Sequence, residues 1–225
     1  MSEPAAPLAP AAFFELAGFR HQALFAGASY VWEALGRIES YLRELGATSI
    51  EGKVSTGAWL EGDLIVIGEG SVVEPGAYIQ GPCFIGRNTE VRHGAYLRGN
   101  VVVGDGCVVG HATEVKNSVF LDGAKAGHFA YVGDSLLGRG VNLGAGTKLA
   151  NLRLDGARVT VRIGENEIDT GRRKLGAVLG DGTETGCNSV TNPGTFLGRG
   201  CRVLPCVNIG GHAPDGSVLG RRARA

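Results

Sequence analysis

Residues 67–115, IGEGSVVEPGAYIQGPCFIGRNTEVRHGAYLRGNVVVGDGCVVGHATEV, decide the fold. An aliphatic side chain returns at every sixth position of this stretch: Ile67, Val73, Ile79, Ile85, Val91, Leu97, Val103, Val109 and Val115. A period of six fits neither an amphipathic helix nor an alternating strand. It is typical of a triangular prism in which three short strands make one coil of about 18 residues.

The same pattern continues toward the C-terminus after two shortened coils. The spacing runs five, six, six, five, six, six through Phe120, Ala126, Val132, Leu137, Leu143 and Leu149, and returns to six through Leu179, Thr185, Thr191, Leu197, Val203 and Ile209. The 38 glycines agree with many tight turns. We expect Gly, Asn and Asp at the corners of the prism, where the backbone needs positive φ.

Three segments fall outside the period. Residues 1–12 are rich in Ala and Pro, and we expect them to be mobile. Residues 29–45 carry apolar side chains at helical spacing and end at Gly46, which predicts a helix on the open end of the prism or on a neighbouring subunit. Residues 153–175 interrupt the coils. Within them, Val159, Val161 and Ile163 alternate with polar residues before the turn sequence GEN and a second short extended segment, which predicts a protruding β-hairpin. The predicted organisation is a tail and helix over 1–50, a β-helix over 51–215 and a basic tail over 216–225.

The composition excludes some classes of protein. Lys and Arg total 22, as do Asp and Glu, which gives no field for binding nucleic acid or an anionic membrane. No apolar run approaches the roughly 20 residues that cross a bilayer, and the N-terminus lacks the features of a signal peptide. The five cysteines form no CxxC pair, which favours reduced thiols and a cytoplasmic protein. Cys83, Cys107 and Cys201 each lie two positions before an aliphatic residue, so we expect them inside the prism rather than as nucleophiles.

In a prism, the spacing of two residues in the sequence determines whether they are neighbours in space, because residues one coil apart stack about 4.8 Å from each other. Arg98 and Lys116 therefore stack on one face, and the next coil places Gly133 above them. A bound phosphate would explain two stacked cations. The alternative is an exposed column that pairs with nearby acids such as Glu114.

A second column contains His93, His111 and His128, followed by Ala145. Three stacked imidazoles suggest zinc and a metal-dependent hydratase. The geometry argues against one zinc ion, because the outer two residues lie about 10 Å apart, whereas zinc requires every nitrogen at about 2.1 Å. We therefore expect no metal site, and a chemical role for one of the three histidines.

Residues 112–151, ATEVKNSVFLDGAKAGHFAYVGDSLLGRGVNLGAGTKLAN, resemble the acetyltransferase half of the bifunctional enzymes that make UDP-N-acetylglucosamine. The similar segments are EVKNS, KAGHFAYVGD, VNLGAGT and AN. The later stretch, GRRKLGAVLGDGTETG, is similar to the archaeal sugar-1-phosphate nucleotidyltransferase/acetyltransferases. These hexapeptide-repeat acyltransferases are left-handed parallel β-helices, against the usual right-handed crossover rule, so the hand of the prism is taken from the resemblance. The resemblance implies a homotrimer with clefts between subunits, and transfer of an acetyl group from acetyl-CoA to an amino-sugar-1-phosphate such as glucosamine-1-phosphate.

The resemblance also implies roles for individual residues. His128 would be the general base, because an imidazole can exchange protons at neutral pH. The implied substrate-binding residues are Arg98, Lys116, Tyr131, Asn142, Asn151 and Lys174, and the implied cofactor-binding residues are Ala145 and Cys187. For Tyr131 and the asparagines, turn structure remains an alternative explanation.

The chain also departs from the family. It has no Gly-rich phosphate loop of the LAAGxGTRM kind, so nucleotidyl transfer is not expected. Ala157 and Thr160 stand near places where the archaeal relatives carry lysines, and Arg153, Arg158 or Lys174 are candidates to replace them. The basic residues near the C-terminus, Arg221, Arg222 and Arg224, are expected to be a solvated tail. The alternative to an enzyme is a non-catalytic scaffold or sugar-nucleotide-binding subunit that partners a separate nucleotidyltransferase.

Overall fold

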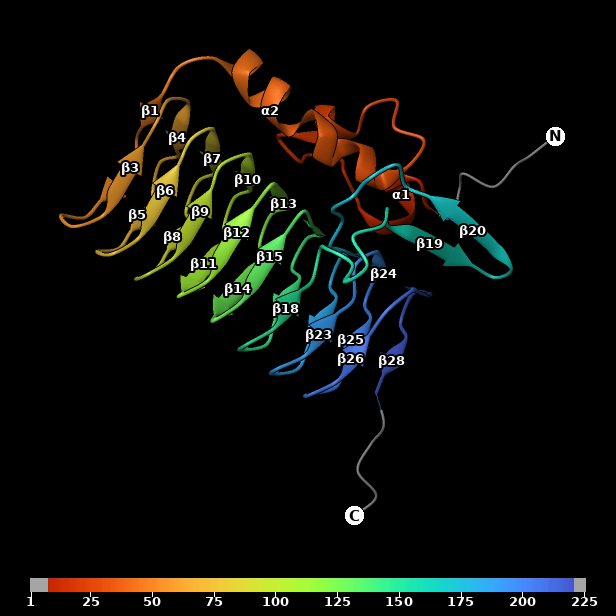
Figure 1. Cartoon of the computed structure of the whole chain (residues 1–225). Coiled ribbons are helices and arrows are strands. Elements are labelled where there is room, and N and C mark those ends of the chain that lie inside the picture. Colours follow the sequence, from red (N-terminus) through yellow and green to blue (C-terminus); the bar gives the residue numbers. More distant parts are fainter. Residues whose placement is uncertain (1–7, 221–225) are drawn as a thin grey trace.

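The computed structural model describes residues 8–220, which form a parallel β-solenoid with three sheets along its length (Figure 1). Sheet A contains β1 (Ser49–Ile50), β4 (Ile65–Ile67), β7 (Cys83–Ile85), β10 (Val101–Val103), β13 (Ser118–Phe120), β16 (Leu136–Leu137), β21 (Ala177–Leu179), β24 (Thr195–Leu197) and β27 (His212–Ala213). Sheet B contains β2 (Lys53–Val54), β5 (Val72–Val73), β8 (Glu90–Val91), β11 (Val108–His111), β14 (Lys125–His128), β17 (Asn142–Leu143), β22 (Glu184–Thr185), β25 (Arg202–Val203) and β28 (Val218–Leu219). Sheet C contains β3 (Trp59–Glu61), β6 (Tyr78–Gln80), β9 (Tyr96–Arg98), β12 (Glu114–Lys116), β15 (Tyr131–Gly133), β18 (Lys148–Leu149), β23 (Val190–Thr191) and β26 (Asn208–Ile209).

The register of the strands confirms the six-residue period. In sheet A, Ile85 pairs with Val103, Val103 with Phe120, and Phe120 with Leu137. The last two steps are the shortened coils that the spacing predicted. Every repeat position from Ile67 to Val203 is buried, and Ile209 at the end of the series is partly buried. The prediction of a left-handed parallel β-helix of hexapeptide repeats is confirmed.

The corners carry the residues expected there. Positive φ occurs at Asn88, Asn100, Asn117, Asp134 and Asn188. It also occurs at Ala112 and Phe129, with φ of 50° and 52°, where neither side chain eases the conformation. The corner at Phe129 therefore stores backbone strain immediately after His128.

Three cysteines lie inside the prism, as expected. Cys83, Cys107 and Cys201 are buried against the other core residues. Burial raises the pKa of the Cys83 and Cys107 thiols to about 12. These thiols stay protonated at neutral pH, which makes them poor nucleophiles.

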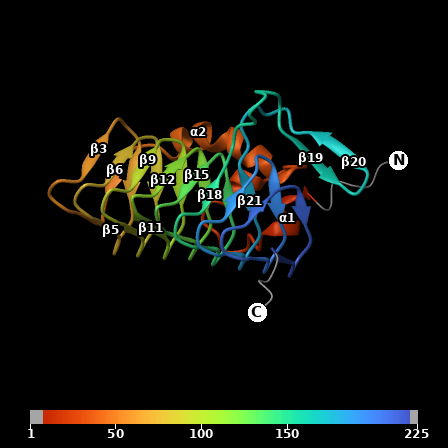
Figure 2. The same ribbon diagram turned by 60° about the horizontal axis from the view of Figure 1, so that its bottom comes forward.

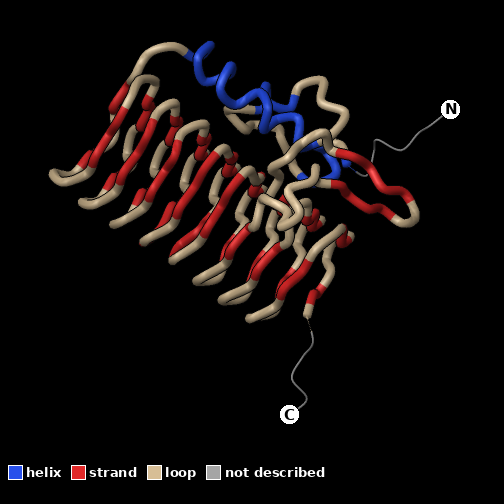
Figure 3. The backbone as a smooth tube through the Cα atoms, in the orientation of Figure 1, coloured by secondary structure: helices blue, strands red, loops and turns tan. Residues whose placement is uncertain are grey.

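The N-terminal segment lies along one side of the solenoid (Figures 1 and 3). It contains α1 (Pro10–Phe13), two 3-10 turns, η2 (Gln22–Phe25) and η3 (Val31–Glu33), and the helix α2 (Ala34–Leu45). The prediction that the helix packs on the open end of the prism or on a neighbouring subunit is wrong. The segment buries its apolar side chains against the outer face of sheet A, on residues that include Phe84, Val119 and Phe196. Leu8 is fully buried there, so the expectation of mobility fails for residues 8–12 and lies outside the described residues for 1–7.

The insertion is a hairpin, as predicted. β19 (Thr160–Ile163) pairs antiparallel with β20 (Asn166–Asp169) and projects from the solenoid (Figure 2). Val159 and Val161 join the apolar cluster beneath the N-terminal segment, which fixes the base of the hairpin. The expected basic tail over 216–225 begins too early, because β28 still pairs with β25 in sheet B. Its basic residues Arg221, Arg222 and Arg224 lie outside the described residues. Within residues 8–220, no helix has the length and apolarity that a membrane crossing requires.

Candidate active site

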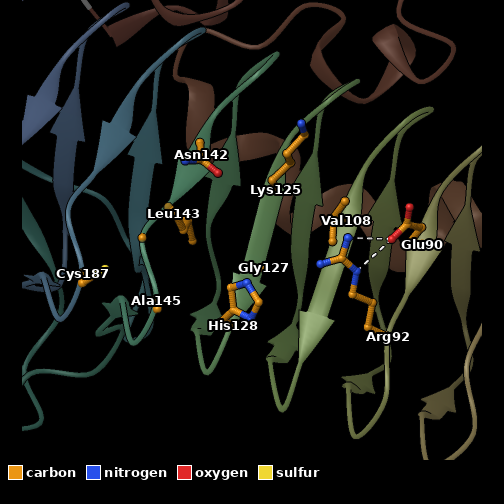
Figure 4. A pocket seen from close by; sticks show the side chains of 11 residues that line it. Glu90, Arg92, Val108, Lys125, Gly127, His128, Asn142, Leu143, Ala145 and Cys187 are labelled. Atoms are coloured by element: carbon orange, nitrogen blue, oxygen red, sulfur yellow. Dashed lines mark hydrogen bonds and ion pairs between the residues drawn. The ribbon is translucent and has the colours of Figure 1, made fainter.

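A groove of about 520 Å³ runs across the outer face of sheet B and reaches the corner between sheets B and C (Figure 4). It is lined by Glu90, Arg92, Val108, Lys125, Gly127, His128, Asn142, Leu143, Gly144, Ala145 and Cys187. Four of these residues are site residues predicted from the sequence: His128, Asn142, Ala145 and Cys187. The strand register explains why they meet. Lys125 pairs with Asn142, and the chain after each strand then places Ala145 beside His128.

His128 differs from the two histidines that precede it in the column. The Nδ1 atoms of His93 and His111 lie 2.6 and 2.9 Å from the carbonyl oxygens of Pro75 and His93, respectively, one coil earlier. The His93 and His111 rings stack with centroids 5.5 Å apart. The exposed His128 imidazole points into the groove (Figure 4) and makes no side-chain hydrogen bond with another described residue. Among the three, His128 is therefore the imidazole available to a ligand in the groove.

These contacts also bear on the zinc hypothesis. The stacked rings of His93 and His111 do not converge on one point, and each Nδ1 already contacts a carbonyl oxygen. Within residues 8–220, no three His, Cys, Asp or Glu side chains gather closely enough to hold a metal ion.

Phe129 follows His128 at the strained corner and is 55% exposed. Its ring contacts the edge of His111, with centroids 5.1 Å apart. An exposed aromatic ring beside the candidate base offers an apolar surface to a ligand. The sequence interpretation gave this residue no role, although it lies within the quoted segment KAGHFAYVGD.

A second group of predicted residues lies around sheet C and the corner that follows it. The Tyr131 hydroxyl donates to Asn151 Oδ1 at 3.4 Å, and Asn151 Nδ2 donates to Asp134 Oδ2 at 2.6 Å. Lys116 Nζ lies 3.9 Å from the same carboxylate oxygen. Burial is the main reason that the pKa of Tyr131 is raised, so its hydroxyl stays protonated and able to donate.

Asp134 is the residue that the sequence interpretation missed. Its carboxylate is buried, and besides Asn151 and Lys116 it accepts a hydrogen bond from Asn117 Nδ2 at 2.8 Å. The sequence spacing could have identified it, because Asn117 lies 17 positions earlier, which is one shortened coil away and in the same column. Asp134 therefore holds Asn151 and Lys116 in place in addition to forming a corner of the prism.

Arg98 lies in the predicted column with Lys116, but it is not free. Its Nη1 lies 2.6 Å from Glu114 Oε1, and this hydrogen bond is the main cause of the raised pKa of Arg98. The guanidinium also lies over the Tyr96 ring, 5.7 Å from its centroid. Arg98 therefore fits the alternative stated above, in which the stacked cations pair with nearby acids such as Glu114.

Three residues are candidates to replace the lysines of the archaeal relatives, and two of them form ion pairs within the chain. Arg153 pairs with Asp155 at 2.6 Å, and Arg158 pairs with Asp169 at 3.5 Å. Lys174 lies where the chain returns to the prism, and with Asp134 it lines a pocket of about 380 Å³.

The predicted site residues thus form two groups, which we call the sheet B group and the sheet C group. His128, Asn142, Ala145 and Cys187 lie on sheet B and its turns, whereas Arg98, Lys116, Tyr131, Asn151 and Lys174 lie on sheet C or beside it. The turn between β14 and β15 separates His128 from Tyr131 by two residues. Tyr131 is thus the residue of the sheet C group beside this turn. Lys116, Asn151 and Lys174 lie around Asp134, at the opposite end of β15. Asn142 lies with the first group, away from the Tyr131–Asn151 pair.

The fold makes this chain a hexapeptide-repeat β-helix. Its homologues are the bifunctional sugar-1-phosphate nucleotidylyltransferase/acetyltransferases, and it matches their C-terminal acetyltransferase portion. The bifunctional sugar-1-phosphate nucleotidylyltransferase/acetyltransferase of Sulfurisphaera tokodaii is 46% identical over 94 residues, which cover 42% of this chain and 23% of that protein. The bifunctional protein GlmU of Methanocaldococcus jannaschii is 34% identical over 176 residues, which cover 76% of this chain and 43% of that protein. The chain thus spans less than half the length of these curated relatives.

The chain is also similar to a family of C-terminal domains and to a solved acyltransferase structure. The family model described as the GMPPB C-terminal domain matches residues 79–165. Among solved structures, the Francisella novicida UDP-N-acetylglucosamine acyltransferase superposes on 73% of this chain and 61% of its own, with a TM-score of 0.47 and 14% identity.

Proposed function

We propose that this chain is an acetyl-CoA-dependent N-acetyltransferase that acts on an amino-sugar-1-phosphate such as glucosamine-1-phosphate. The observation that carries the proposal is the exposed imidazole of His128 in the sheet B groove, with Ala145 on the next coil. The homology to bifunctional proteins named as acetyltransferases supports the same reaction.

The proposed reaction is a direct transfer. The amine of the acceptor attacks the thioester carbon of acetyl-CoA, a C–N bond forms, and His128 accepts the proton that the nitrogen loses. The C–S bond then breaks and CoA leaves as a thiolate, which a proton neutralises. Ala145 leaves room for the thioester, and Cys187 extends the same surface by one coil. Holding the amine and the thioester together supplies much of the rate enhancement.

The sheet C group would bind the acceptor in this proposal. Tyr131 and Asn151 would hydrogen-bond the sugar, while Lys116 and Lys174 would attract its phosphate. Arg98 would join them after exchanging Glu114 for the phosphate. A homotrimer would close the open side of the groove with a neighbouring subunit, as the resemblance implies.

A thiol-release assay tests the proposal. Acetyl-CoA is mixed with the purified chain and with glucosamine-1-phosphate, galactosamine-1-phosphate or no acceptor. We expect CoA release that depends on one of the amino-sugar phosphates. An absence of acceptor-dependent release with both sugars would contradict the proposal.

The pairing of Arg98 with Glu114 favours one alternative. A cation neutralised within the chain suits a non-catalytic subunit that partners a separate nucleotidyltransferase. Such a subunit would bind a sugar nucleotide without binding acetyl-CoA. Equilibrium dialysis with both ligands separates the two functions, and we expect acetyl-CoA to bind.

A further inference from the structure

The segment Gly171–Lys174 connects the inserted hairpin to the prism and contains three successive cations. It lines, together with Asp134, the pocket of about 380 Å³. Backbone hydrogen bonds fix the segment and the residues that follow it. Val159 N donates to Arg172 O at 2.8 Å, Leu175 N donates to Asn151 O at 2.9 Å, and Gly176 N donates to Asp134 O at 2.8 Å. The three cations are therefore held beside residues of the sheet C group.

The positive charge of this segment is not neutralised within the described part of the chain. Across residues 8–220, no carboxylate lies within 4.0 Å of a side-chain nitrogen of Arg172, Arg173 or Lys174. Arg153 and Arg158, at the other end of the same insertion, each pair with an acid. The three adjacent cations repel one another unless an anion compensates them.

Asp134 does not supply that compensation. Its carboxylate accepts hydrogen bonds from Asn117 and Asn151 and lies 3.9 Å from Lys116. Lys116 already balances its single charge. The residues that line the pocket thus carry three positive charges against the one negative charge of Asp134, which Lys116 shares.

The three cations have different exposures. Arg173 and Lys174 are exposed, while Arg172 is partly buried and donates from Nε to the Lys174 carbonyl oxygen at 3.3 Å. Burial lowers the pKa of Arg172, and the charge of Asp134 opposes that shift. A partly desolvated guanidinium gains more from a bound anion than an exposed one does.

We propose that Arg172, Arg173 and Lys174 form an anion subsite that binds a phosphate group of the acceptor. That the ligand is the acceptor rests on the proposed function. Guanidinium groups bind phosphate oxygens in bidentate fashion, and Lys174 adds a point charge. Hydrogen bonds link the subsite to Tyr131, because Asp134 contacts Asn151 and Asn151 contacts Tyr131. Two residues separate Tyr131 from His128 in the sequence.

A binding measurement tests the subsite independently of catalysis. Inorganic phosphate and uridine diphosphate are titrated calorimetrically into the full chain, an Arg173→Ala/Lys174→Ala double variant and Arg158→Ala. Arg158 is a matched control because it belongs to the same insertion, is exposed and is paired with Asp169. We expect the Kd of at least one probe to rise tenfold or more in the double variant and to change less than twofold in Arg158→Ala.

The two probes distinguish the source of the phosphate. Tighter binding of inorganic phosphate indicates a sugar monophosphate, whereas a large preference for uridine diphosphate indicates a nucleotide-linked acceptor. Equal affinities in the wild type and the double variant would overturn the subsite, as would the failure of both probes to bind the wild type at millimolar concentration. A circular-dichroism melt establishes that the double variant is folded.

Kinetics then connect the subsite to the transfer reaction. In the double variant, the KM for glucosamine-1-phosphate should rise tenfold or more, while the rate with unphosphorylated glucosamine stays unchanged. An equal loss with both acceptors would contradict a phosphate-binding role. If the binding result holds but the wild type transfers no acetyl group, the subsite stands and the proposed function falls.

Discussion

Asp134 shows how a corner residue can organise a site at the scale of single side chains. Its buried carboxylate accepts from two asparagine amides and faces Lys116. Asn151 in turn accepts from the Tyr131 hydroxyl. The positions of these candidate substrate-binding residues therefore depend on one carboxylate.

Asp134→Asn should weaken acceptor binding. The amide offers one oxygen in place of two, so Asn117 and Asn151 can no longer both donate to a carboxylate. A hydrogen bond to a charged group is worth about 1.5–3 kcal/mol, so steady-state kinetics should show the acceptor KM raised about tenfold or more. Asp155→Asn, a matched change at an exposed carboxylate of the insertion, should leave KM unchanged. An unaltered KM in folded Asp134→Asn would remove the positioning role.

Thr191 is a core residue whose hydroxyl group lacks a hydrogen-bond partner in residues 8–220. It occupies a repeat position and its Oγ1 is buried. Thr185, in the neighbouring sheet, shares a 2.8 Å hydrogen bond with Thr147 Oγ1 and accepts from Gly144 N at 3.1 Å. Both threonines occupy repeat positions, but only the hydroxyl of Thr185 has hydrogen-bond partners among the described residues.

Thr191→Val should stabilise the protein because it replaces an unpaired hydroxyl with a methyl group of similar size. The expected gain in the free energy of unfolding is about 1 kcal/mol, whereas Thr185→Val should lose a comparable amount. Urea titrations of both variants measure the difference. A loss of stability in Thr191→Val would show that its hydroxyl has a partner in solution.

At the scale of elements, the N-terminal segment explains why sheet A differs from the other two sheets. Most three-residue strands of sheet A are buried throughout, as in β10 and β21, and β4 has one partly buried residue. In sheet C, by contrast, β9 exposes the residues on both sides of the repeat position. Phe13 and Trp32 contact Phe196 on the outer face, with ring centroids 5.9 and 5.5 Å away. Strands that are apolar on both faces predict a covered sheet. The sequence shows this pattern at 101–103 (VVV) and 177–179 (AVL), but it does not show which segment covers the sheet.

His21 lies in this interface and makes its stability depend on pH. Its side chain is buried, its Nδ1 contacts the Tyr41 hydroxyl at 2.9 Å, and its Nε2 has no partner among the described residues. Burial, with a smaller contribution from Arg20, lowers the pKa of His21 to about 4. The folded protein therefore holds His21 neutral.

The sign of the pH effect follows from that shift. Between the unfolded pKa of about 6.5 and the folded value, the unfolded chain binds the extra proton, so stability falls as the pH decreases. We expect this histidine to cost about 2 kcal/mol between pH 7 and pH 5. His21→Gln should flatten the curve of unfolding free energy against pH over that interval. A curve with the same slope in both proteins would contradict the buried neutral histidine.

At the scale of the whole molecule, the period of six predicted the architecture because each inward position must be apolar for the coils to stack. The two shortened coils and the hairpin were equally visible, since they interrupt the count at Phe120, Leu137 and 153–175. The location of the N-terminal segment was not predictable, because the packing of an apolar helix depends on a surface distant in sequence. The site was predicted in part: stacking placed His128 beside Ala145, but the ion pair of Arg98 depends on side-chain conformation.

The N-terminal segment covers sheet A. The groove therefore lies on sheet B, and the sheet C group lies on sheet C and the corner that follows it. His128 lies at the corner between sheets B and C. We propose that its imidazole accepts the proton of the attacking amine.

The most direct test compares acceptor-dependent CoA release by the wild type, His128→Ala and His93→Ala. His93 is a matched control from the same column, and its Nδ1 contacts the Pro75 carbonyl oxygen. Loss of a general base should lower kcat by about 100-fold or more in His128→Ala, with acetyl-CoA binding retained and His93→Ala close to the wild type. Full activity in His128→Ala would contradict the account.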